Sequence, residues 1–535
     1  MGARIQFAEC AVVAGAIFLL TGPAVRSQTV QHLSVPQPGG MPGMPGMPVM
    51  TGITRVTNGV KVTWDGPSGY YQVYQKLSLR DSKWVAVGKA TNLVRNATIT
   101  ALYSNAFFRV SGPSPQYVGS QACAECHPAI HATELKTGHA AAFTNAQFVE
   151  EGGQTNRYCL ACHTVGYGLP TGFVSLSKTP RLAGVQCENC HGPAAKHAAN
   201  PDDPIAVPRV ELAATVCGGC HTGSQHPTYE EWLTSGHAEV VAGALSSMSS
   251  STTNLNNCGR CHSGSVRLSL LEGNPLPVGD FNVSVVCVTC HNPHQVTPNP
   301  AQLRNPIAST ANYSITASGN FTKQYKTNIN LCAQCHNDLA ASWTNSIAPP
   351  HHSPQYNMLL GTVGVLDTGA PPNQPGSHAL LVTNQCVQCH MQTEDAAAGQ
   401  PAITGHSFRI ELYDTCLQCH PFEPELLAEF TETGISNQIQ QVKEDLDLWA
   451  MAQAPDSLWA EYGTRAWEYT TPGDLSPGGP GPTAAEQALI PETIRMARYD
   501  LYVVLYDGSY GVHNILYATT LLDTAENWIQ EQLNQ

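Results

Sequence analysis

The feature that most constrains this chain is a Cys-x-x-Cys-His motif, which occurs nine times and uses eighteen of the nineteen cysteines. This pattern is the attachment signature of c-type haem: the two thiols bond the porphyrin vinyl groups, and the histidine binds the iron from the proximal side. The sequence therefore predicts nine covalently bound c haems. In chain order the motifs are Cys123, Cys126, His127 (motif 1); Cys159, Cys162, His163 (motif 2); Cys187, Cys190, His191 (motif 3); Cys217, Cys220, His221 (motif 4); Cys258, Cys261, His262 (motif 5); Cys287, Cys290, His291 (motif 6); Cys332, Cys335, His336 (motif 7); Cys386, Cys389, His390 (motif 8); and Cys416, Cys419, His420 (motif 9).

Two other interpretations of the cysteines are weaker. A zinc site takes two Cys-x-x-Cys pairs for one ion and does not need a histidine after every second cysteine. Disulfides would explain an even number of cysteines but not the histidines. One motif alone would leave the question open, whereas nine of them leave no spare cysteine in the predicted mature chain.

The N-terminus predicts export. Residues 1–27 have a short apolar stretch, Ala11 to Leu20, followed by small residues before an expected cleavage after Ser27. A membrane anchor is the alternative, but the stretch is short for a bilayer and no later segment is long enough. The odd cysteine, Cys10, would leave with the signal peptide. We expect a mature protein that does not span a membrane and lies in the periplasm or outside the cell.

The next two regions contain no cysteine. Residues 28–50 are a Pro/Gly/Met-rich linker by composition, and His32 within it is not expected to bind iron. Residues 51–112 alternate as short strands, and Asn58-Gly59 between two of them predicts a hairpin with a type I′ turn. The pattern resembles a small fibronectin-type-III or immunoglobulin-like β-sandwich, for which we expect a spacer, cap or docking role.

The remaining chain divides into a haem-binding region and a helical tail. Residues 113–420 contain all nine motifs at irregular spacing, from 28 to 54 residues between first cysteines, which excludes a solenoid of equal repeats. Short helices are expected at Glu134 to His139 and at Glu230 to His237. Residues 421–535 show helical apolar spacing and predict a bundle packed on the last haems. The fold class is therefore mixed: a β-sandwich, a loop-rich and mainly α multihaem domain, and a C-terminal helical bundle.

Charge narrows the choice of partners. The formal net charge is −14 with neutral histidines, and haem propionates add further carboxylates. An acidic surface argues against nucleic acid and for basic partners or simple solubility. We expect other cytochromes or redox proteins as partners.

Histidines outside the motifs are the expected distal ligands. Twelve remain after the motifs are counted, and nine bis-histidine haems would need nine of them. Methionine is the rival, but most of the ten lie in the signal, the linker or isolated positions. His351 is as reachable as His352, and His131 is a spare. The nine expected ligands are His139, His197, His226, His237, His294, His352, His378, His406 and His513.

Residues 117–535 resemble the multihaem cytochrome superfamily that includes hydroxylamine oxidoreductase, its tetrahaem electron acceptor, octahaem tetrathionate reductase and pentahaem nitrite reductase. This resemblance implies haems packed in alternating stacked and near-perpendicular pairs. It is carried by Tyr117 to Ser120, Lys136 to Ala140, Cys190 to Pro193 with His197, Cys389 to Met391 with Gly405 to Phe408, and Gly508 to Asn514.

The chain departs from the enzymes of that superfamily. It lacks the Cys-x-x-Cys-Lys variant that leaves the catalytic haem of the nitrite reductases open. Hydroxylamine oxidoreductase marks its catalytic haem with a tyrosine crosslink, and Tyr499, Tyr502, Tyr506 and Tyr510 leave that question open here, although packing is the commoner role.

Three functions remain as hypotheses. The leading one is a nonahaem electron carrier between redox partners, with no catalytic residue. The second is an oxidoreductase of small nitrogen or sulfur compounds such as nitrite, hydroxylamine or tetrathionate, with one open haem. The third is a subunit of an extracellular cytochrome filament.

Overall fold

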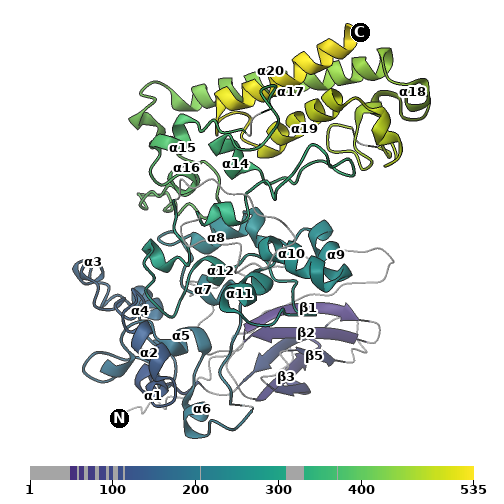
Figure 1. The fold of residues 1–535 in the computed structure, drawn as a ribbon. Coiled ribbons are helices and arrows are strands. Elements are labelled where there is room, and N and C mark those ends of the chain that lie inside the picture. Colours follow the sequence, from purple (N-terminus) through teal and green to yellow (C-terminus); the bar gives the residue numbers. More distant parts are fainter. Residues whose placement is uncertain are drawn as a thin grey trace, which may run out of the picture. The chain divides into compact units, whose positions relative to one another are not determined.

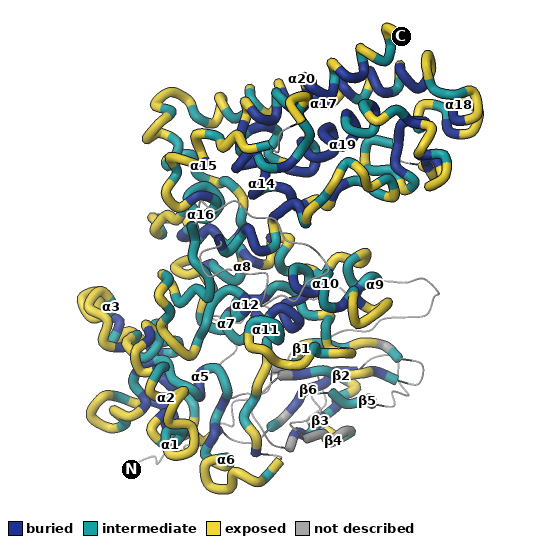
Figure 2. The backbone as a smooth tube through the Cα atoms, in the orientation of Figure 1, coloured by how far each residue is buried: buried dark blue, intermediate teal, exposed yellow. Residues whose placement is uncertain are grey.

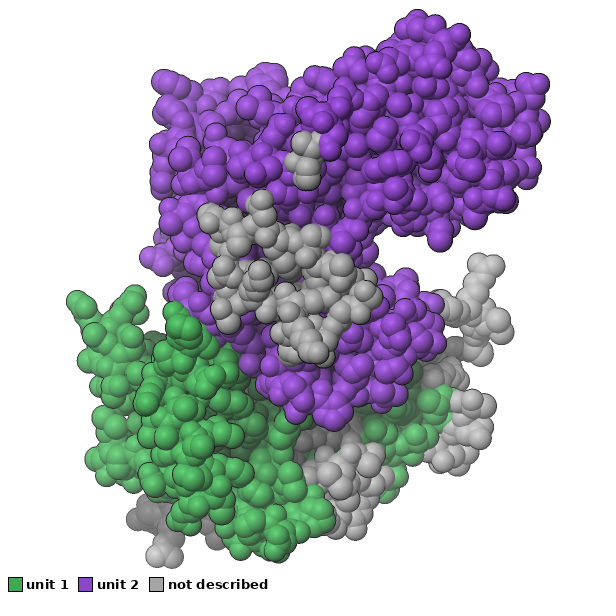
Figure 3. Space-filling view, viewed as in Figure 1, with its two compact units in different colours: residues 1–222, 292–298 green, residues 223–291, 299–535 purple. Residues whose placement is uncertain are grey.

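The computed structural model of the protein describes residues 49–535, apart from 57–58, 66–69, 79–82, 92–95, 100–105, 113–114, 205, 309–329, 370–371 and 477. The predicted signal peptide with Cys10, and almost all of the predicted linker with His32, lie outside the described residues. The chain divides into two compact units, coloured separately in Figure 3. Unit 1 is residues 1–222 and 292–298, and unit 2 is residues 223–291 and 299–535. Motifs 1 to 4 belong to unit 1 and motifs 5 to 9 to unit 2.

Unit 1 begins with six strands in the region where the alternating sequence predicts them. They form two antiparallel three-stranded sheets in the orders β1-β2-β5 and β4-β3-β6 (Figure 1). The predicted hairpin joins β1 and β2, with Val56 opposite Gly59, while Asn58 of its turn lies outside the described residues. The strands are β1 (Val49–Val56), β2 (Gly59–Asp65), β3 (Tyr70–Lys76), β4 (Val85–Thr91), β5 (Asn96–Ile99) and β6 (Phe107–Ser111).

The two sheets share one core. Val60, Val62 and Trp64 of β2 belong to the same buried cluster as Val73 of β3 and Val110 of β6. Successive residues of a strand point to opposite faces, so the i, i+2, i+4 spacing in β2 places all three side chains on the core face.

The rest of unit 1 is loop-rich, and a buried carboxylate ties its segments together. Glu188 accepts hydrogen bonds from the backbone N–H groups of Val118, Gly119 and Ala194, at 3.1, 2.8 and 2.8 Å. Burial raises the pKa of Glu188, although these hydrogen bonds oppose the rise. The short helices are α1 (Ser120–Ala124), α2 (Pro128–Glu134), α3 (Ala146–Glu150), α4 (Arg157–His163), η1 (Pro180–Leu182), α5 (Cys187–His191), α6 (Ala195–Ala199) and α7 (Thr215–Gly218).

The helix expected at Glu134 to His139 is misplaced by one turn. α2 ends at Glu134, and the residues that follow form turns. The hydroxyl of Thr137 donates to the carbonyl of Glu134 at 2.7 Å, so a side chain takes the acceptor that a continuing helix would use.

The first part of unit 2 is also built from short elements. Several small clusters of buried side chains stabilise it, among them one formed by Met248, Leu255 and Val266. The elements are α8 (Thr228–Leu233), η2 (Gly236–Ala238), α9 (Ala242–Ser250), α10 (Thr252–His262), α11 (Gly264–Glu272), α12 (Cys287–Cys290), η3 (Pro300–Gln302), η4 (Cys332–Gln334), α14 (Gln355–Leu360), α15 (Ser377–Leu381), α16 (Cys386–His390) and η5 (Cys416–Gln418).

The C-terminal part of unit 2 is helical, as the apolar spacing predicts. α17 (Pro424–Ala452), α19 (Glu492–Asp507) and α20 (Ile515–Leu533) lie side by side, with α18 (Asp456–Tyr462), η6 (Gly463–Trp467) and η7 (Glu486–Leu489) at one end (Figure 1).

The facing sides of these long helices are buried and their outer sides exposed (Figure 2). Val442, Leu446 and Trp449 of α17 pack in the same cluster as Val503 of α19 and Leu521 of α20. Within the described residues, no helix combines the length and apolar character needed to cross a membrane.

Candidate haem sites

Each motif lies on one helical turn. In motif 1 the backbone N–H of His127 donates to the carbonyl of Cys123 at 2.8 Å, and in motif 9 that of His420 donates to Cys416 at 2.7 Å. Residues i, i+3 and i+4 share one face of a helix, so the two thiols and the imidazole of each motif emerge on the same side. This is the local arrangement that thioether attachment and proximal ligation of a c haem require.

Thiols of different motifs meet in unit 1. Cys123 of motif 1 is hydrogen-bonded to Cys187 of motif 3, which lowers the pKa of Cys123 and raises that of Cys187. Cys162 of motif 2 and Cys220 of motif 4 form the same kind of pair. Cys190 of motif 3 also lies close enough to Cys220 to raise its pKa further. The motifs of unit 1 are therefore neighbours in the order 1, 3, 4, 2.

Thiols also meet in unit 2. A hydrogen bond from Cys261 of motif 5 lowers the pKa of Cys335 of motif 7 to about 5. A hydrogen bond between Cys332 of motif 7 and Cys386 of motif 8 lowers the pKa of Cys386 to about 7. Burial raises the pKa of Cys290 of motif 6 to about 11, and Cys335 contributes to this rise. Motif 7 is therefore next to motifs 5, 6 and 8.

The last link in unit 2 joins motifs 8 and 9. Burial raises the pKa of Cys389 to about 11, and the neighbouring Cys416 adds to the rise. At the centre of the arrangement, the buried guanidinium of Arg267 donates to Gln334 Oε1 at 2.6 Å and to Cys335 Sγ at 3.3 Å. Because thiols become thioethers when haem is attached, these contacts matter as measures of how close the motifs are.

Seven of the nine motif histidines face a second histidine from elsewhere in the chain. In every pair the ring centres are separated by roughly the same gap. The pairs are His139 with His221, His191 with His294, His237 with His336, His262 with His351, His291 with His406, His378 with His420 and His390 with His513, at 6.1, 5.9, 6.1, 5.7, 6.4, 6.2 and 6.2 Å.

This separation fits one metal ion between two imidazoles. Bonds of about 2 Å from the metal to each ring nitrogen put the ring centres about 6 Å apart. Such a gap is too wide for a direct hydrogen bond between the rings. Among the described residues, no group of three or more His, Cys, Asp or Glu side chains converges on one point to bind a metal ion. The donor set therefore fits an iron with two axial imidazoles and a porphyrin around it.

The second ring nitrogen of these histidines meets a hydrogen-bond acceptor. His191 Nδ1 lies 2.6 Å from the carbonyl oxygen of Arg209, and His291 Nδ1 lies 2.7 Å from that of Ala301. A proton on Nδ1 leaves the lone pair of Nε2 free for a metal. The same arrangement occurs at His163, His378, His390 and His406, whose Nδ1 atoms lie 2.9, 2.8, 3.0 and 2.9 Å from backbone carbonyl oxygens.

Burial keeps several paired histidines neutral. Burial, followed by the neighbouring His336, lowers the pKa of His237 to about 4. Burial and His262 likewise lower the pKa of His351 to about 4. Neutral imidazole is the form that binds a metal, so these side chains are ready to coordinate at neutral pH.

The structure places His351, rather than the expected His352, opposite His262. The ring of His352 instead stacks on Tyr506, with ring centres 3.7 Å apart. The hydroxyl of Ser353 lies 2.9 Å from Nδ1 of His351 and helps to orient its ring toward His262. Six other expected ligands do face a motif histidine: His139, His237, His294, His378, His406 and His513.

The remaining expected ligands lie elsewhere. His197 of α6 has a buried Nδ1 without a hydrogen-bond partner in the described chain, and His226 is exposed. Motif residues His127 and His163 do not belong to the seven pairs. The ring of His163 stacks on Phe148, with ring centres 4.1 Å apart and planes inclined by 7°. No described pair contains His127 or His163, and the distal ligands of all nine motifs stay predictions.

The four tyrosines of the helical tail have packing partners. Tyr502 donates to the buried carboxylate of Glu468, and Tyr499 donates to the carbonyl of Ala341 at 3.1 Å. The ring of Tyr506 stacks on that of His352. The sequence did not single out the carboxylates Asp507 and Glu231, which accept hydrogen bonds from the expected ligands His513 and His406. The one indication in the sequence is that each of these carboxylates lies within a few residues of a motif or of an expected ligand histidine.

Similarity to known proteins agrees with this chemistry. Residues 122–192 match the family described as cytochrome c554 and c-prime. The multihaem cytochrome MtrA of Shewanella baltica (strain OS185) is 25% identical over 280 residues, which cover 44% of this chain and 76% of that protein. Cytochrome c-554 of Nitrosomonas europaea is 31% identical over 90 residues, 14% of this chain and 38% of the relative. Among solved structures, the outer cell wall cytochrome OcwA matches 77% of this chain and 100% of its own, with 21% identity and a TM-score of 0.47.

Motifs, opposed histidines and similarity together define a class of protein. The chain is similar to multihaem cytochromes c, and its motifs and these similarities support covalently bound haem c and electron transfer through several haems.

Proposed function

We propose that this chain is an exported nonahaem cytochrome that passes electrons along bis-histidine haems between redox partners. The observation that carries the proposal is the set of seven opposed histidine pairs, each with a gap of about one iron and two metal–nitrogen bonds. Two histidines would hold each iron and leave no place for a substrate, so the haem would supply electron transfer alone.

Each haem would be held by residues from distant parts of the chain. The two thiols and the proximal histidine come from one motif, and the distal histidine comes from another segment of the same unit. The haem itself supplies the one-electron Fe(III)/Fe(II) couple. The chain positions the imidazoles, keeps water from the iron and brings neighbouring motifs together.

The order of neighbouring motifs suggests the route. Contacts in unit 1 link motifs 1, 3, 4 and 2, and contacts in unit 2 link motifs 6, 7, 8 and 9, with motif 5 beside motif 7. Motif 7 is thus a branch point, at which electrons from two neighbours would join.

The surroundings of the haem region bear on partners and location. The net charge of −14 favours a basic redox partner, and the predicted signal peptide favours the periplasm or the cell exterior. The strand orders β1-β2-β5 and β4-β3-β6 support a fibronectin-type-III-like β-sandwich in residues 51–112, which we propose as a docking or spacer domain.

Spectroscopy of the purified holoprotein tests the proposal. We expect nine haems per chain by haem assay and mass, and ferric EPR signals that are mostly low-spin. A count well below nine, or high-spin iron at most sites, would contradict it.

A second candidate function is supported by motifs 1 and 2. His127 and His163 are outside the seven pairs, so these two sites are where an open iron would lie. An iron with a vacant axial position could bind nitrite, hydroxylamine or a sulfur oxyanion. Turnover of these substrates with a viologen donor would favour an enzyme, and carbon monoxide binding by the reduced protein would count the open sites.

A further inference from the structure

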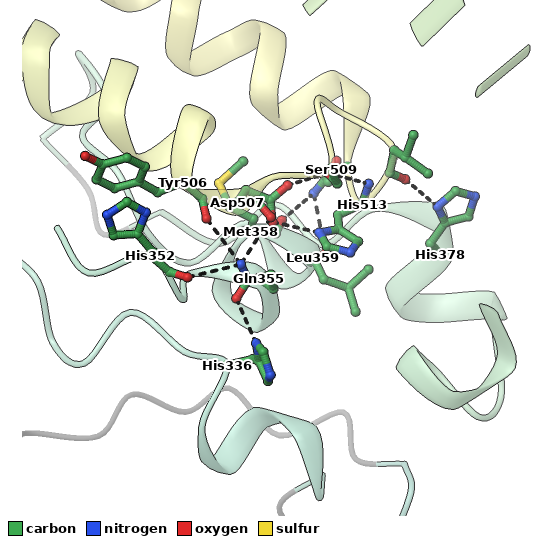
Figure 4. Close-up of polar contacts among 12 residues, drawn as sticks. His336, His352, Gln355, Met358, Leu359, His378, Tyr506, Asp507, Ser509 and His513 are labelled. Atoms are coloured by element: carbon green, nitrogen blue, oxygen red, sulfur yellow. Dashed lines mark hydrogen bonds and ion pairs between the residues drawn. The ribbon is translucent and has the colours of Figure 1, made fainter. Parts of the chain in front are cut away.

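Among the expected distal histidines, His513 has a carboxylate as the hydrogen-bond partner of its second ring nitrogen. Nδ1 of His513 lies 2.7 Å from Oδ1 of Asp507, and the Asp507 side chain is 1% exposed (Figure 4). His513 is the residue that faces His390 of motif 8 across 6.2 Å. The His513 imidazole thus contacts a buried carboxylate and faces the histidine of motif 8.

Other histidines of the described pairs have weaker acceptors at Nδ1. Five of them have a backbone carbonyl oxygen there, His351 has the hydroxyl of Ser353, and His336 has the amide oxygen of Gln355 at 3.3 Å. All of these acceptors are neutral. His513 differs from these seven in having a carboxylate at Nδ1.

The loop that carries Asp507 and His513 is held independently of the histidine. Gly508 ends α19 in the left-handed conformation, with φ 71°. The hydroxyl of Ser509 donates to Oδ2 of Asp507 and accepts the backbone N–H of His513 at 3.2 Å. Asn514 caps α20 by accepting the N–H of Tyr517 at 3.3 Å. Contacts other than the one to the His513 imidazole therefore hold the Asp507 carboxylate in place.

We propose that Asp507 is a positioning residue that lowers the reduction potential of the haem at motif 8. The inference rests on the proposed function, because it takes His513 as the distal ligand of that haem. A carboxylate that accepts the Nδ1 proton makes the imidazole a stronger donor. A stronger donor stabilises Fe(III) relative to Fe(II), so the site accepts an electron less readily; no bond forms or breaks.

The place of motif 8 gives this effect a function. Its thiols lie beside those of motif 7 and motif 9. If the haem at motif 8 has a lower potential than its neighbours, an electron that moves from motif 7 to motif 9 must take one thermodynamically unfavourable step. Asp507 would therefore set how easily electrons reach the last haem of the chain.

The same loop also contributes to the surroundings of histidines at motifs 7 and 9, but through neutral groups. The carbonyl of Asp507 accepts from Gln355 Nε2 at 3.2 Å, and Gln355 Oε1 lies 3.3 Å from His336 Nδ1 of motif 7. The carbonyl of Val512 lies 2.8 Å from Nδ1 of His378, which faces motif 9 (Figure 4). Neutralising the Asp507 side chain leaves both backbone contacts in place, so the direct effect is confined to motif 8.

The test is a potentiometric titration of the holoprotein followed by optical and EPR spectra. Loss of a carboxylate that binds a ligand histidine typically changes metal affinity or activity by about tenfold or more. A tenfold change in the Fe(III)/Fe(II) equilibrium corresponds to about 59 mV for a one-electron couple. We expect Asp507→Asn to raise one couple by about that amount while the haem stays low-spin. Asp507→Glu, which keeps the charge, should restore most of the potential.

Two further variants guard against misfolding and nonspecific charge effects. Ser509→Ala removes a hydrogen bond that withdraws negative charge from the Asp507 carboxylate, so the reduction potential of the haem at motif 8 should fall. Asp445→Asn removes a buried carboxylate of α17 that binds Gln441 and Gln530, and it should leave that couple in place.

The outcomes separate the two levels of the argument. If Asp507→Asn stays low-spin and no couple moves, or if Asp445→Asn moves the same couple as far, the role of Asp507 is refuted while His513 remains a ligand. If His513→Ala creates no high-spin iron, the ligand assignment itself fails and the proposal falls with it.

Discussion

His351 and His352 offer the sharpest test of the site, because they are neighbours in the chain with opposite surroundings. The ring of His351 lies 5.7 Å from the ring of His262, whereas His352 stacks on Tyr506 at 3.7 Å. We therefore expect His351→Ala and His352→Ala to differ in their effect on iron, although the two substitutions remove the same side chain.

The magnitude follows from the number of sites. If His351 is the distal ligand of the haem at motif 5 and nine haems are bound, His351→Ala should make about one ninth of the iron high-spin. His352→Ala removes a ring contact worth about 0.5–1.5 kcal/mol. It should lower the melting temperature slightly and leave the spin state unchanged.

The assay is quantitative EPR of the fully oxidised holoprotein, with haem content measured on the same samples. Added imidazole should return His351→Ala to the low-spin state by filling the space left beside the iron. High-spin iron in His352→Ala together with a low-spin His351→Ala would refute the reasoning from ring geometry.

Two other predictions concern residues that hold the ligands and the helical core. Glu231 accepts hydrogen bonds from the N–H and hydroxyl of Thr404 and from the N–H of His406, at 2.8, 2.7 and 2.8 Å; we expect Glu231→Ala to cost about 1.5–3 kcal/mol and to add high-spin iron at motif 6, with Glu231→Gln as the milder control. Burial raises the pKa of Asp500, whose Oδ1 accepts the N–H of Val365 at 2.8 Å while Oδ2 is buried without a partner. A raised pKa means that the folded state holds the proton longer, so stability present near pH 4 is lost as the pH rises. Asp500→Asn should then be more stable than the parent at pH 7 and equal to it near pH 4, and matching melting curves across this range would contradict the prediction.

Local features of the chain were predictable because their causes are local. Alternation in Val60, Val62 and Trp64 predicts β2, and the apolar spacing of Val442 and Leu446 predicts α17. The Cys-x-x-Cys-His turn needs no distant residue. The helix at Glu134 was misplaced, since the competing hydrogen bond of Thr137 is not visible as a periodic pattern.

The distal ligands were harder to predict, because any histidine in a loop can reach several sites. His139 and His513 were identified by their sequence contexts, and both face a motif histidine. His352 was chosen over His351 without a physical reason to separate them. The carboxylate of Asp507 was overlooked. Asp507 lies six positions before His513, and the two side chains come into contact only when the turn between α19 and α20 is formed.

The sequence by itself determined how many haem-attachment motifs the chain has and where they lie, and it predicted that strands precede helices. The tertiary structure decided which imidazole lies opposite which, because each pair joins segments that only folding brings within 6.4 Å or less. It also decided which acceptor the imidazoles meet, since the acceptors are backbone carbonyls and the side chains of Ser353, Gln355 and Asp507. Attachment is encoded in five consecutive residues, whereas the chemical environment of the iron depends on the fold as a whole.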